Sequence, residues 1–347
     1  MTTEVMRSPR VRSGALPLRA WRPQGRAAAI AGIGVDVPER VVTNADLEKV
    51  VDTSDQWIRE RTGIERRRLA EEGAATFELA TRAARAALAD AGVEAEEVDL
   101  IIASTSSPDG PFPSVACRVQ EQLGAYGCPA YDLLAACSGF IYGLSAGEAA
   151  IATGRAETVL VIGAEVLSRL VDWTDRSTCV LFSDGAGAAV LRPAERGAGF
   201  LGWCLGADGR GYDQITYGDV AKGAWAASDK DPRIGMKGPD VFRFANEIFI
   251  RQAFAVAEAA GIEPSEIDLW VPHQANGRII EAAARRIGLP MERVMVTVQD
   301  YGNNSTATIP MALRRALDER RIEPGHKVLL AGFGSGLTWG SCLLEWE

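Results

Sequence analysis

Paired cysteines, histidine and long apolar runs are scarce or missing in this chain of 347 residues. Its six cysteines stand singly at 117, 128, 137, 179, 204 and 342, so no C-x-x-C pair supports a zinc or thioredoxin-like site. No apolar run approaches the ~18 residues of a membrane span, and no secretory signal is recognisable. These absences predict a cytoplasmic protein without a membrane segment, whose thiols stay reduced.

Positive charge is also in short supply. The net charge is −9 and the pI is about 5.1, which argues against a nucleic-acid partner, although a local basic patch can still bind an acidic protein. The start of the chain differs, because residues 1–26 hold six arginines, three prolines and one acid. We expect residues 1–27 to form a flexible tail, since this composition cannot build a core. A misassigned start codon and a targeting segment are the alternatives.

An internal duplication is visible in the sequence. Residues 88–100 resemble residues 257–269, and residues 159–163 resemble residues 328–332, each pair offset by 169 positions. Each longer segment reads as the end of an alanine-rich helix, a terminating glycine, an acidic loop and an apolar strand. We therefore predict two similar halves, residues 28–195 and residues 196–347.

Within each half, short apolar segments alternate with helical patterns, which predicts an α/β fold with mostly buried sheets. The predicted strands are 98–103, 130–135, 158–162, 267–271 and 294–298. The predicted helices are 76–91, 138–153, 245–260, 276–287 and 305–319. Functional groups in such folds gather where strands end and helices begin.

Cys137 stands at one of these junctions, in Ala-Ala-Cys-Ser-Gly-Phe (135–140). A thiol at a helix N-terminus meets partial positive charge and unpaired N–H groups, and both favour the nucleophilic thiolate. A buried structural cysteine in a turn of small residues is the alternative interpretation.

The two histidines differ in their settings. His326 lies in a polar turn, whereas His273, in Pro-His-Gln-Ala-Asn (272–276), directly follows an apolar strand. A neutral imidazole at that position can donate a hydrogen bond or move a proton. A core histidine satisfied by its neighbours is the alternative.

Asn303, in Tyr-Gly-Asn-Asn-Ser (301–305), occupies a third junction. A helix N-cap is the simpler interpretation, but Asn304 and Ser305 compete for that role and leave one amide spare. With the offset of 169, Cys137 falls within three residues of Asn303. If the halves pack about a pseudo-twofold axis, these turns meet in one site.

These motifs resemble those of the β-ketoacyl-acyl-carrier-protein synthase III family, over residues 28–347. Further matching segments are Gly-Phe-Gly-Ser-Gly-Leu-Thr-Trp (332–339), Asp-Gln-Trp-Ile-Arg-Glu-Arg-Thr-Gly (55–63) and Phe-Ser-Asp-Gly-Ala-Gly (182–187). The resemblance implies a thiolase-like fold of two duplicated α/β halves in α-β-α-β-α layers, and a homodimer.

The resemblance also implies a reaction, a decarboxylating condensation that starts fatty-acid synthesis. Cys137 takes the acyl group from a short acyl-CoA, while its own N–H and that of Ser335 bind the oxyanion, each donor worth about 3–4 kcal/mol of barrier. Malonyl-acyl carrier protein then loses CO2, and His273 and Asn303 donate hydrogen bonds to the enolate. No metal or redox cofactor is implied. The positions that match coenzyme A contacts are Trp57, Arg61, Arg176 and Asn276.

Three features of the sequence bear on specificity. Ser335 replaces the middle residue of a loop that usually holds three glycines, and Pro239 stands where a polar pantetheine contact is expected. Phe112 matches a position at the far end of the acyl pocket, near the dimer interface. A large ring there predicts a short primer of about two to four carbons. Packing at the interface alone is the alternative role of Phe112.

A basic helix face is predicted to receive the acidic carrier protein. Arg278 and Arg285 are seven residues apart and share a face, with Arg286 adjacent and Arg243 matching a nearby basic position. This face would flank the entrance beside His273 and steer the carrier toward it. A solvated helix face with no partner is the alternative.

Other functions remain open from the sequence. A polyketide-priming ketosynthase and a non-decarboxylating acyltransferase share the same motifs. A thiolase is disfavoured, because Cys342 lacks the expected Cys-x-Gly pattern. A non-catalytic acyl-binding subunit is the alternative of a different class, but such a chain would be expected to lose Cys137.

Overall fold

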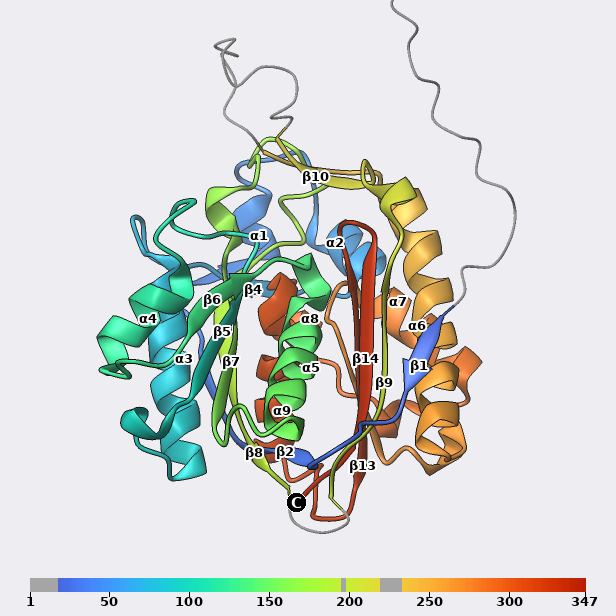
Figure 1. Cartoon of the computed structure of the whole chain (residues 1–347). Coiled ribbons are helices and arrows are strands. Elements are labelled where there is room, and N and C mark those ends of the chain that lie inside the picture. Colours follow the sequence, from blue (N-terminus) through green and yellow to red (C-terminus); the bar gives the residue numbers. More distant parts are fainter. Residues whose placement is uncertain (1–17, 195–197, 219–232) are drawn as a thin grey trace, which may run out of the picture.

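The computed structural model describes residues 18–194, 198–218 and 233–347 (Figure 1). Two five-stranded sheets dominate it, and we name them the N-terminal sheet and the C-terminal sheet. The N-terminal sheet has the order β2 (Ala28–Asp36), β8 (Asp184–Pro193), β7 (Val159–Val166), β5 (Leu100–Ser104), β6 (Ala130–Leu133). The C-terminal sheet has the order β1 (Arg19–Trp21), β9 (Gly199–Ala207), β14 (Thr338–Glu345), β13 (Lys327–Gly334), β12 (Leu269–Pro272).

Helices form three further layers around and between the sheets (Figure 1). The outer face of the N-terminal sheet carries α3 (Thr76–Ala91) and α4 (Val115–Leu123), and that of the C-terminal sheet carries α6 (Gly238–Ala260) and α7 (Gly277–Ile287). Two helices, α5 (Gly139–Ala152) and α9 (Thr308–Asp318), lie between the sheets. The predicted α-β-α-β-α arrangement is confirmed.

Smaller elements surround one end of these layers. They are α1 (Asn44–Leu47), α2 (Asp55–Thr62), α8 (Val298–Tyr301), the hairpin of β3 (Val41–Thr43) with β4 (Arg66–Arg68), and the pair of β10 (Ile215–Tyr217) with β11 (Ile234–Met236). Among the described residues, no helix combines the length and the apolar composition that crossing a membrane requires.

The duplication extends to backbone geometry. Leu100 pairs with Val159 in the N-terminal sheet, and the residues 169 positions later, Leu269 and Val328, pair in the same parallel manner. The central helices α5 and α9 begin 169 residues apart. The turns before them hold two non-glycine residues in the left-handed region, Ala136 (φ 46°) and Ser305 (φ 48°), again 169 apart. The predicted duplication is confirmed at single-residue register, and we propose residue 195 as the boundary between the halves.

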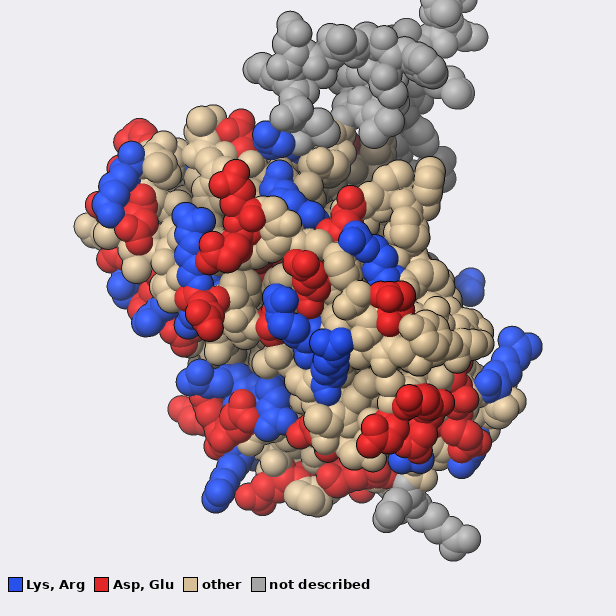
Figure 2. Space-filling view, turned by 90° about the vertical axis from the view of Figure 1, so that its left-hand side faces the viewer, with Lys and Arg blue, Asp and Glu red and all other residues tan. Residues whose placement is uncertain are grey.

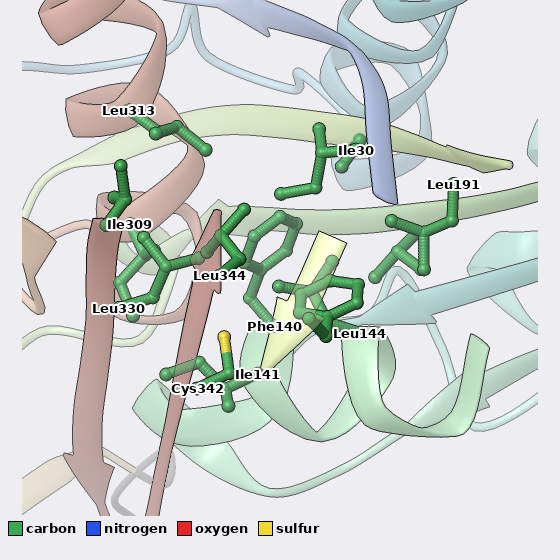
Figure 3. Packing of buried hydrophobic residues seen from close by; sticks show 14 of the residues in the cluster. Ile30, Phe140, Ile141, Leu144, Leu191, Ile309, Leu313, Leu330, Cys342 and Leu344 are labelled. Atoms are coloured by element: carbon green, nitrogen blue, oxygen red, sulfur yellow. The ribbon is translucent and has the colours of Figure 1, made fainter. Parts of the chain in front are cut away.

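The central helices are held by an apolar core between the two sheets (Figure 3). Phe140, Ile141 and Leu144 of α5 pack with Ile309 and Leu313 of α9. The sheets contribute Ile30, Leu191, Leu330, Cys342 and Leu344. Burial of each large apolar side chain contributes about 1.5–3 kcal/mol. This packing fixes where the two helices begin, and therefore fixes the turns that precede them.

Two predictions of local structure were wrong. Residues 1–17 lie outside the described residues, but the rest of the predicted tail is ordered, because β1 pairs with β9 and Arg22 donates to the Ala260 carbonyl at 2.9 Å. Residues 294–298 do not form a strand. Only Val294 bridges to Trp270, and the amides of Thr297 and Val298 donate instead to the Gln274 side chain.

On the side of the molecule that carries α3 and α4, acidic and basic residues are interspersed (Figure 2). Arg82 of α3, for example, pairs with Asp36 at 2.9 Å. This face presents no continuous basic surface of the kind that binds nucleic acid.

Candidate active site

The structure brings Cys137, His273 and Asn303 to one cavity of about 170 Å³. Cys137 lies in the turn between β6 and α5, His273 directly follows β12, and Asn303 follows α8. Phe333 and Gly334, at the end of β13, complete part of the wall. Three junctions that are far apart in the sequence therefore converge on one space.

Pseudo-symmetry explains why Cys137 and His273 meet. Their counterparts 169 residues away are Thr306 and Ser104, and the Thr306 hydroxyl donates to the Ser104 hydroxyl at 3.1 Å. The turn before each central helix thus lies against the strand end of the other half. In one copy of this junction the pair is Ser104 and Thr306, and in the other it is His273 and Cys137.

The backbone of Cys137 is closely packed. A side chain at Gly334 would place its Cβ 2.6 Å from the Cys137 amide nitrogen, so only glycine permits this approach. Burial raises the pKa of the Cys137 thiol to about 12. The expectation that the helix N-terminus favours the thiolate is therefore wrong for the unliganded protein, since desolvation outweighs the helix dipole.

His273 is buried and neutral. Burial lowers its pKa to about 3. Its Nδ1 lies 2.6 Å from Thr308 Oγ1, and the Phe333 ring packs edge-on to the imidazole at 5.5 Å. The Thr308 hydroxyl also reaches the Ser305 carbonyl at 2.9 Å. Because a hydroxyl has one proton, its choice of acceptor sets the tautomer of His273.

The Asn303 side chain is oriented by its neighbour rather than acting as a simple helix cap. Its Oδ1 accepts the Ser305 amide proton at 2.8 Å, which leaves the NH2 group as the donor available at the cavity. Its backbone is held by Leu181, whose carbonyl accepts the Asn303 amide proton at 2.9 Å.

A second cavity, of about 510 Å³, also reaches Cys137. Its apolar wall consists of Leu134, Leu167, Leu170, Phe182, Ile215 and Ile234. Ser335 and Gly336 line it as well. Gly336 has a φ of 135°, but Ser335 is not among the left-handed residues of the described chain. A serine therefore fits this loop without strain, and its hydroxyl donates to the Ile215 carbonyl at 2.7 Å.

Phe112 lies apart from both cavities. Its side chain is 83 % exposed in the single chain, and it contributes to neither lining. The predicted role of Phe112 at the end of an acyl pocket therefore requires a second copy of the chain.

The residues predicted to bind coenzyme A form two contacts beside the Cys137 cavity. The guanidinium of Arg176 lies over the Trp57 ring, 5.3 Å from its centroid. Asn276 lines the cavity, caps α7, and donates to the Arg61 carbonyl at 3.0 Å, which ties the end of α2 to the start of α7.

The predicted carrier-docking arginines are not equally close to the cavity. Arg278 lies 5.8 Å from the centroid of the Phe242 ring, and Phe242 lines the cavity. Arg243 pairs with Asp240 at 3.4 Å. Arg285 and Arg286 lie in the last turn of α7, about 10 Å further along the axis.

Sequence reasoning missed three polar residues at this site: Glu165, Ser305 and Thr308. Glu165 is the one acid in the buried strand β7, and this isolated charge in an apolar segment was the available signal. Ser305 and Thr308 gave no comparable signal, because hydroxyls are common at helix starts.

The comparisons with known proteins agree with this geometry. Family models described as "3-Oxoacyl-[acyl-carrier-protein (ACP)] synthase III" and as its C-terminal part match residues 131–209 and 257–346. A curated β-ketoacyl-acyl-carrier-protein synthase III of Symbiobacterium thermophilum is 49 % identical over 92 % of this chain and 98 % of its own length.

Two solved structures are also similar. The 3-oxoacyl-acyl-carrier-protein synthase III of Aquifex aeolicus has a TM-score of 0.87 and 46 % identity, covering 92 % of this chain and 100 % of that one. The priming β-ketosynthase of the R1128 polyketide pathway has a TM-score of 0.89 and 34 % identity, covering 94 % and 98 %.

Proposed function

Because the chain belongs to the 3-oxoacyl-acyl-carrier-protein synthase III family, we propose that it joins a short acyl-CoA to malonyl-acyl carrier protein with loss of CO2. The observation that carries this proposal is the meeting of Cys137, His273 and Asn303 in one cavity. The product would be a β-ketoacyl-acyl carrier protein, formed at the start of fatty-acid synthesis. The substrates are thioesters, and the proposed chemistry requires no metal or redox cofactor.

In the first half-reaction, the Cys137 thiol attacks the acyl-CoA carbonyl and retains the acyl group. The 510 Å³ cavity offers the acyl chain apolar walls, and the backbone N–H groups of Cys137 and Ser335 are the proposed oxyanion donors. The Trp57–Arg176 pair and the link between Asn276 and Arg61 support binding of coenzyme A beside this cavity.

In the second half-reaction, the carboxylate of the malonyl thioester leaves as CO2 and an enolate forms. The Asn303 NH2 group can donate to the enolate oxygen, because its amide oxygen is occupied by Ser305. His273 is neutral at physiological pH and donates from Nε2 when Thr308 supplies the proton that Nδ1 accepts. The enolate carbon then attacks the acyl group on Cys137.

The related activities are supported to different degrees. The similarity to a polyketide-priming ketosynthase keeps that pathway as a second candidate for the same condensation. A thiolase needs a second thiol at the site, whereas Cys342 is fully buried in β14 within the central core. A non-decarboxylating acyltransferase would use the first half-reaction alone.

We further propose that the chain forms a homodimer along β6 and acts in the cytoplasm. Within the described residues, β6 is an outer strand with apolar side chains exposed around it, among them Leu134 (77 %) and Tyr126 (75 %). Such an edge invites pairing with another chain. A second copy paired there would also cover Phe112.

Release of CO2 tests the proposed function. The protein should release CO2 from malonyl-acyl carrier protein and form a β-ketoacyl product only when an acyl-CoA is also present. Exchange of acyl groups between thioesters without CO2 release would favour the non-decarboxylating acyltransferase. Retention of acyl-CoA without turnover would favour the acyl-binding subunit.

A further inference from the structure

A buried acid lies behind the nucleophile and is not used in the reaction described above. Glu165 is fully buried in β7, where every neighbour along the strand is apolar or glycine. Its carboxyl accepts hydrogen bonds from the Ser106 amide at 3.0 Å, the Thr105 hydroxyl at 3.2 Å and the Ser107 hydroxyl at 2.5 Å. Burial raises its pKa to about 7 although these donors, together with Ser305, oppose the rise. This carboxyl can therefore both accept and release a proton near neutral pH.

Ser305 lies between this acid and Cys137. Its hydroxyl is close enough to lower the pKa of both groups, yet the oxygen is buried and completes no hydrogen bond with another described residue. The side chain is held in place by a left-handed backbone (φ 48°) and by the bond from its amide to Asn303 Oδ1. Ser305 is thus a positioned hydroxyl whose proton is not committed to any acceptor.

The negative charge of Glu165 also acts directly on Cys137. A carboxylate at 165 raises the pKa of the thiol, because two negative charges in one buried site repel each other. The two groups are therefore suited to share a single proton, with the thiol neutral while the carboxyl is charged and the carboxyl neutral once sulfur has lost its proton.

His273 is a poor alternative acceptor in the resting protein. Burial lowers its pKa to about 3, so a charged imidazole is disfavoured there, and Nδ1 already contacts Thr308. The groups that face Glu165 in the described chain are the three donors of residues 105–107, together with Ser305 and Cys137.

Resting on the proposed function, we propose that Glu165 is a positioning residue that takes the Cys137 proton through the Ser305 hydroxyl during acylation and returns it after condensation. As sulfur bonds to the acyl carbon, its proton passes to Ser305 Oγ while the Ser305 proton passes to the Glu165 carboxylate. The coenzyme A thiolate leaves and takes a proton from water. When the enolate carbon displaces sulfur, Glu165 returns its proton by the same route, so the full reaction consumes one solvent proton.

The competing interpretation is structural, since Glu165 also anchors the turn of residues 105–107. Three variants separate the two roles. Ser305→Ala removes the relay and leaves the anchor intact. Glu165→Gln removes the proton acceptor and keeps the shape of the side chain. Ser107→Ala weakens the anchor and leaves both the carboxyl and the relay in place.

The measurement is the rate of acylation of Cys137 by acetyl-CoA between pH 5.5 and about 9.5, followed by rapid quenching and intact mass. The wild-type rate should rise through an inflection near pH 7, as Glu165 becomes a carboxylate. Ser305→Ala and Glu165→Gln should lose this inflection and be roughly 100-fold slower at pH 7, with the difference narrowing at high pH. Ser107→Ala should keep the inflection.

A wild-type profile and rate in Ser305→Ala would overturn this inference, even if Glu165→Gln failed to fold. An unchanged inflection in Glu165→Gln would overturn it as well, and would leave Glu165 with the anchoring role alone. By contrast, the absence of any acylation of wild-type Cys137 across this pH range would contradict the proposed function itself.

Discussion

At the scale of single residues, one hydroxyl proton determines how His273 can act. Thr308 Oγ1 lies within hydrogen-bonding distance of both His273 Nδ1 and the Ser305 carbonyl. When the proton goes to Nδ1, the neutral ring carries its own proton on Nε2 and can donate to an enolate. When the proton goes to the carbonyl, Nε2 is an acceptor and cannot stabilise negative charge.

Thr308→Val should therefore impair decarboxylation more than acylation. Without the hydroxyl, Nδ1 loses its donor and the useful tautomer is no longer favoured, so CO2 release should fall roughly 10-fold to 100-fold. Thr308→Ser retains the hydroxyl and should restore the rate. The comparison is CO2 release against acylation of Cys137 in the same preparations. Equal losses in both half-reactions would show that Thr308 acts only through packing.

At the scale of elements, α5 carries an unusual charge. Glu148 is 5 % exposed, its Oε1 has no hydrogen-bond partner in the described chain, and burial raises its pKa to about 7. The folded state keeps the proton to higher pH than the unfolded state, so this group favours folding at low pH. Its contribution is lost as the pH rises through about 7.

Glu148→Gln should remove part of this pH dependence. The variant should match the wild type in Tm near pH 5 and exceed it by roughly 3 °C or more at pH 8. Glu258→Gln, at an exposed position of α6, is the matched control and should show no such trend. Thermal unfolding at the two pH values measures the effect, and equal Tm differences at both would refute it.

The predictability of the elements differed for physical reasons. The helix over residues 76–91 was predicted with its observed bounds, because alanine-rich periodicity and the Gly92 cap are local signals. Residues 294–298 read as a strand because of their apolar composition. Their amides are instead satisfied by Gln274, a side chain twenty-odd positions away, and such a tertiary contact leaves no local trace.

The helix α7 provides the prediction on the carrier protein. Arg278→Glu should raise KM for malonyl-acyl carrier protein roughly 3-fold to 10-fold and weaken its dependence on salt. Arg285→Glu should have a smaller effect, because Arg285 lies two turns from the cavity-lining contact of Arg278 with Phe242. Acylation by acyl-CoA should change little.

Arg155→Glu is the control for this experiment. Arg155 is exposed beyond the C-terminal end of α5, whereas Cys137 precedes its N-terminal end, so the helix of 14 residues separates them by about 21 Å. If reversal at Arg278 and Arg285 left KM for the carrier unchanged, α7 would not belong to the docking surface.

At the scale of the whole molecule, the duplication explains what the sequence could and could not reveal about the site. The offset of 169 residues related the turns of Cys137 and Asn303, and the motifs identified both, together with His273. Glu165 was missed because its proximity to Cys137 depends on β7 lying beside β5 and on the turn of Ser305 from the other half. Only the packed halves bring these groups together.

Assembly should also set the length of the primer. Phe112 is exposed in the single chain, and the 510 Å³ cavity beside Cys137 has room for a longer acyl group. If a partner's Phe112 closes this cavity, Phe112→Ala should shift the preference from acetyl-CoA toward longer acyl-CoAs while the dimer persists. Competition assays with mixed acyl-CoAs and light scattering test this. A wild-type preference for octanoyl-CoA, or loss of the dimer without a change in selectivity, would contradict it.

Acylation of the intact protein tests the central claim most directly. After incubation with acetyl-CoA, the mass of the chain should increase by one acetyl group, and peptide mapping should locate that group on Cys137 rather than on the other five cysteines. Cys137→Ser should show no such thioester. Acylation of another cysteine, or a stable wild-type chain that never acquires the acyl group, would contradict the assignment of Cys137 as the nucleophile.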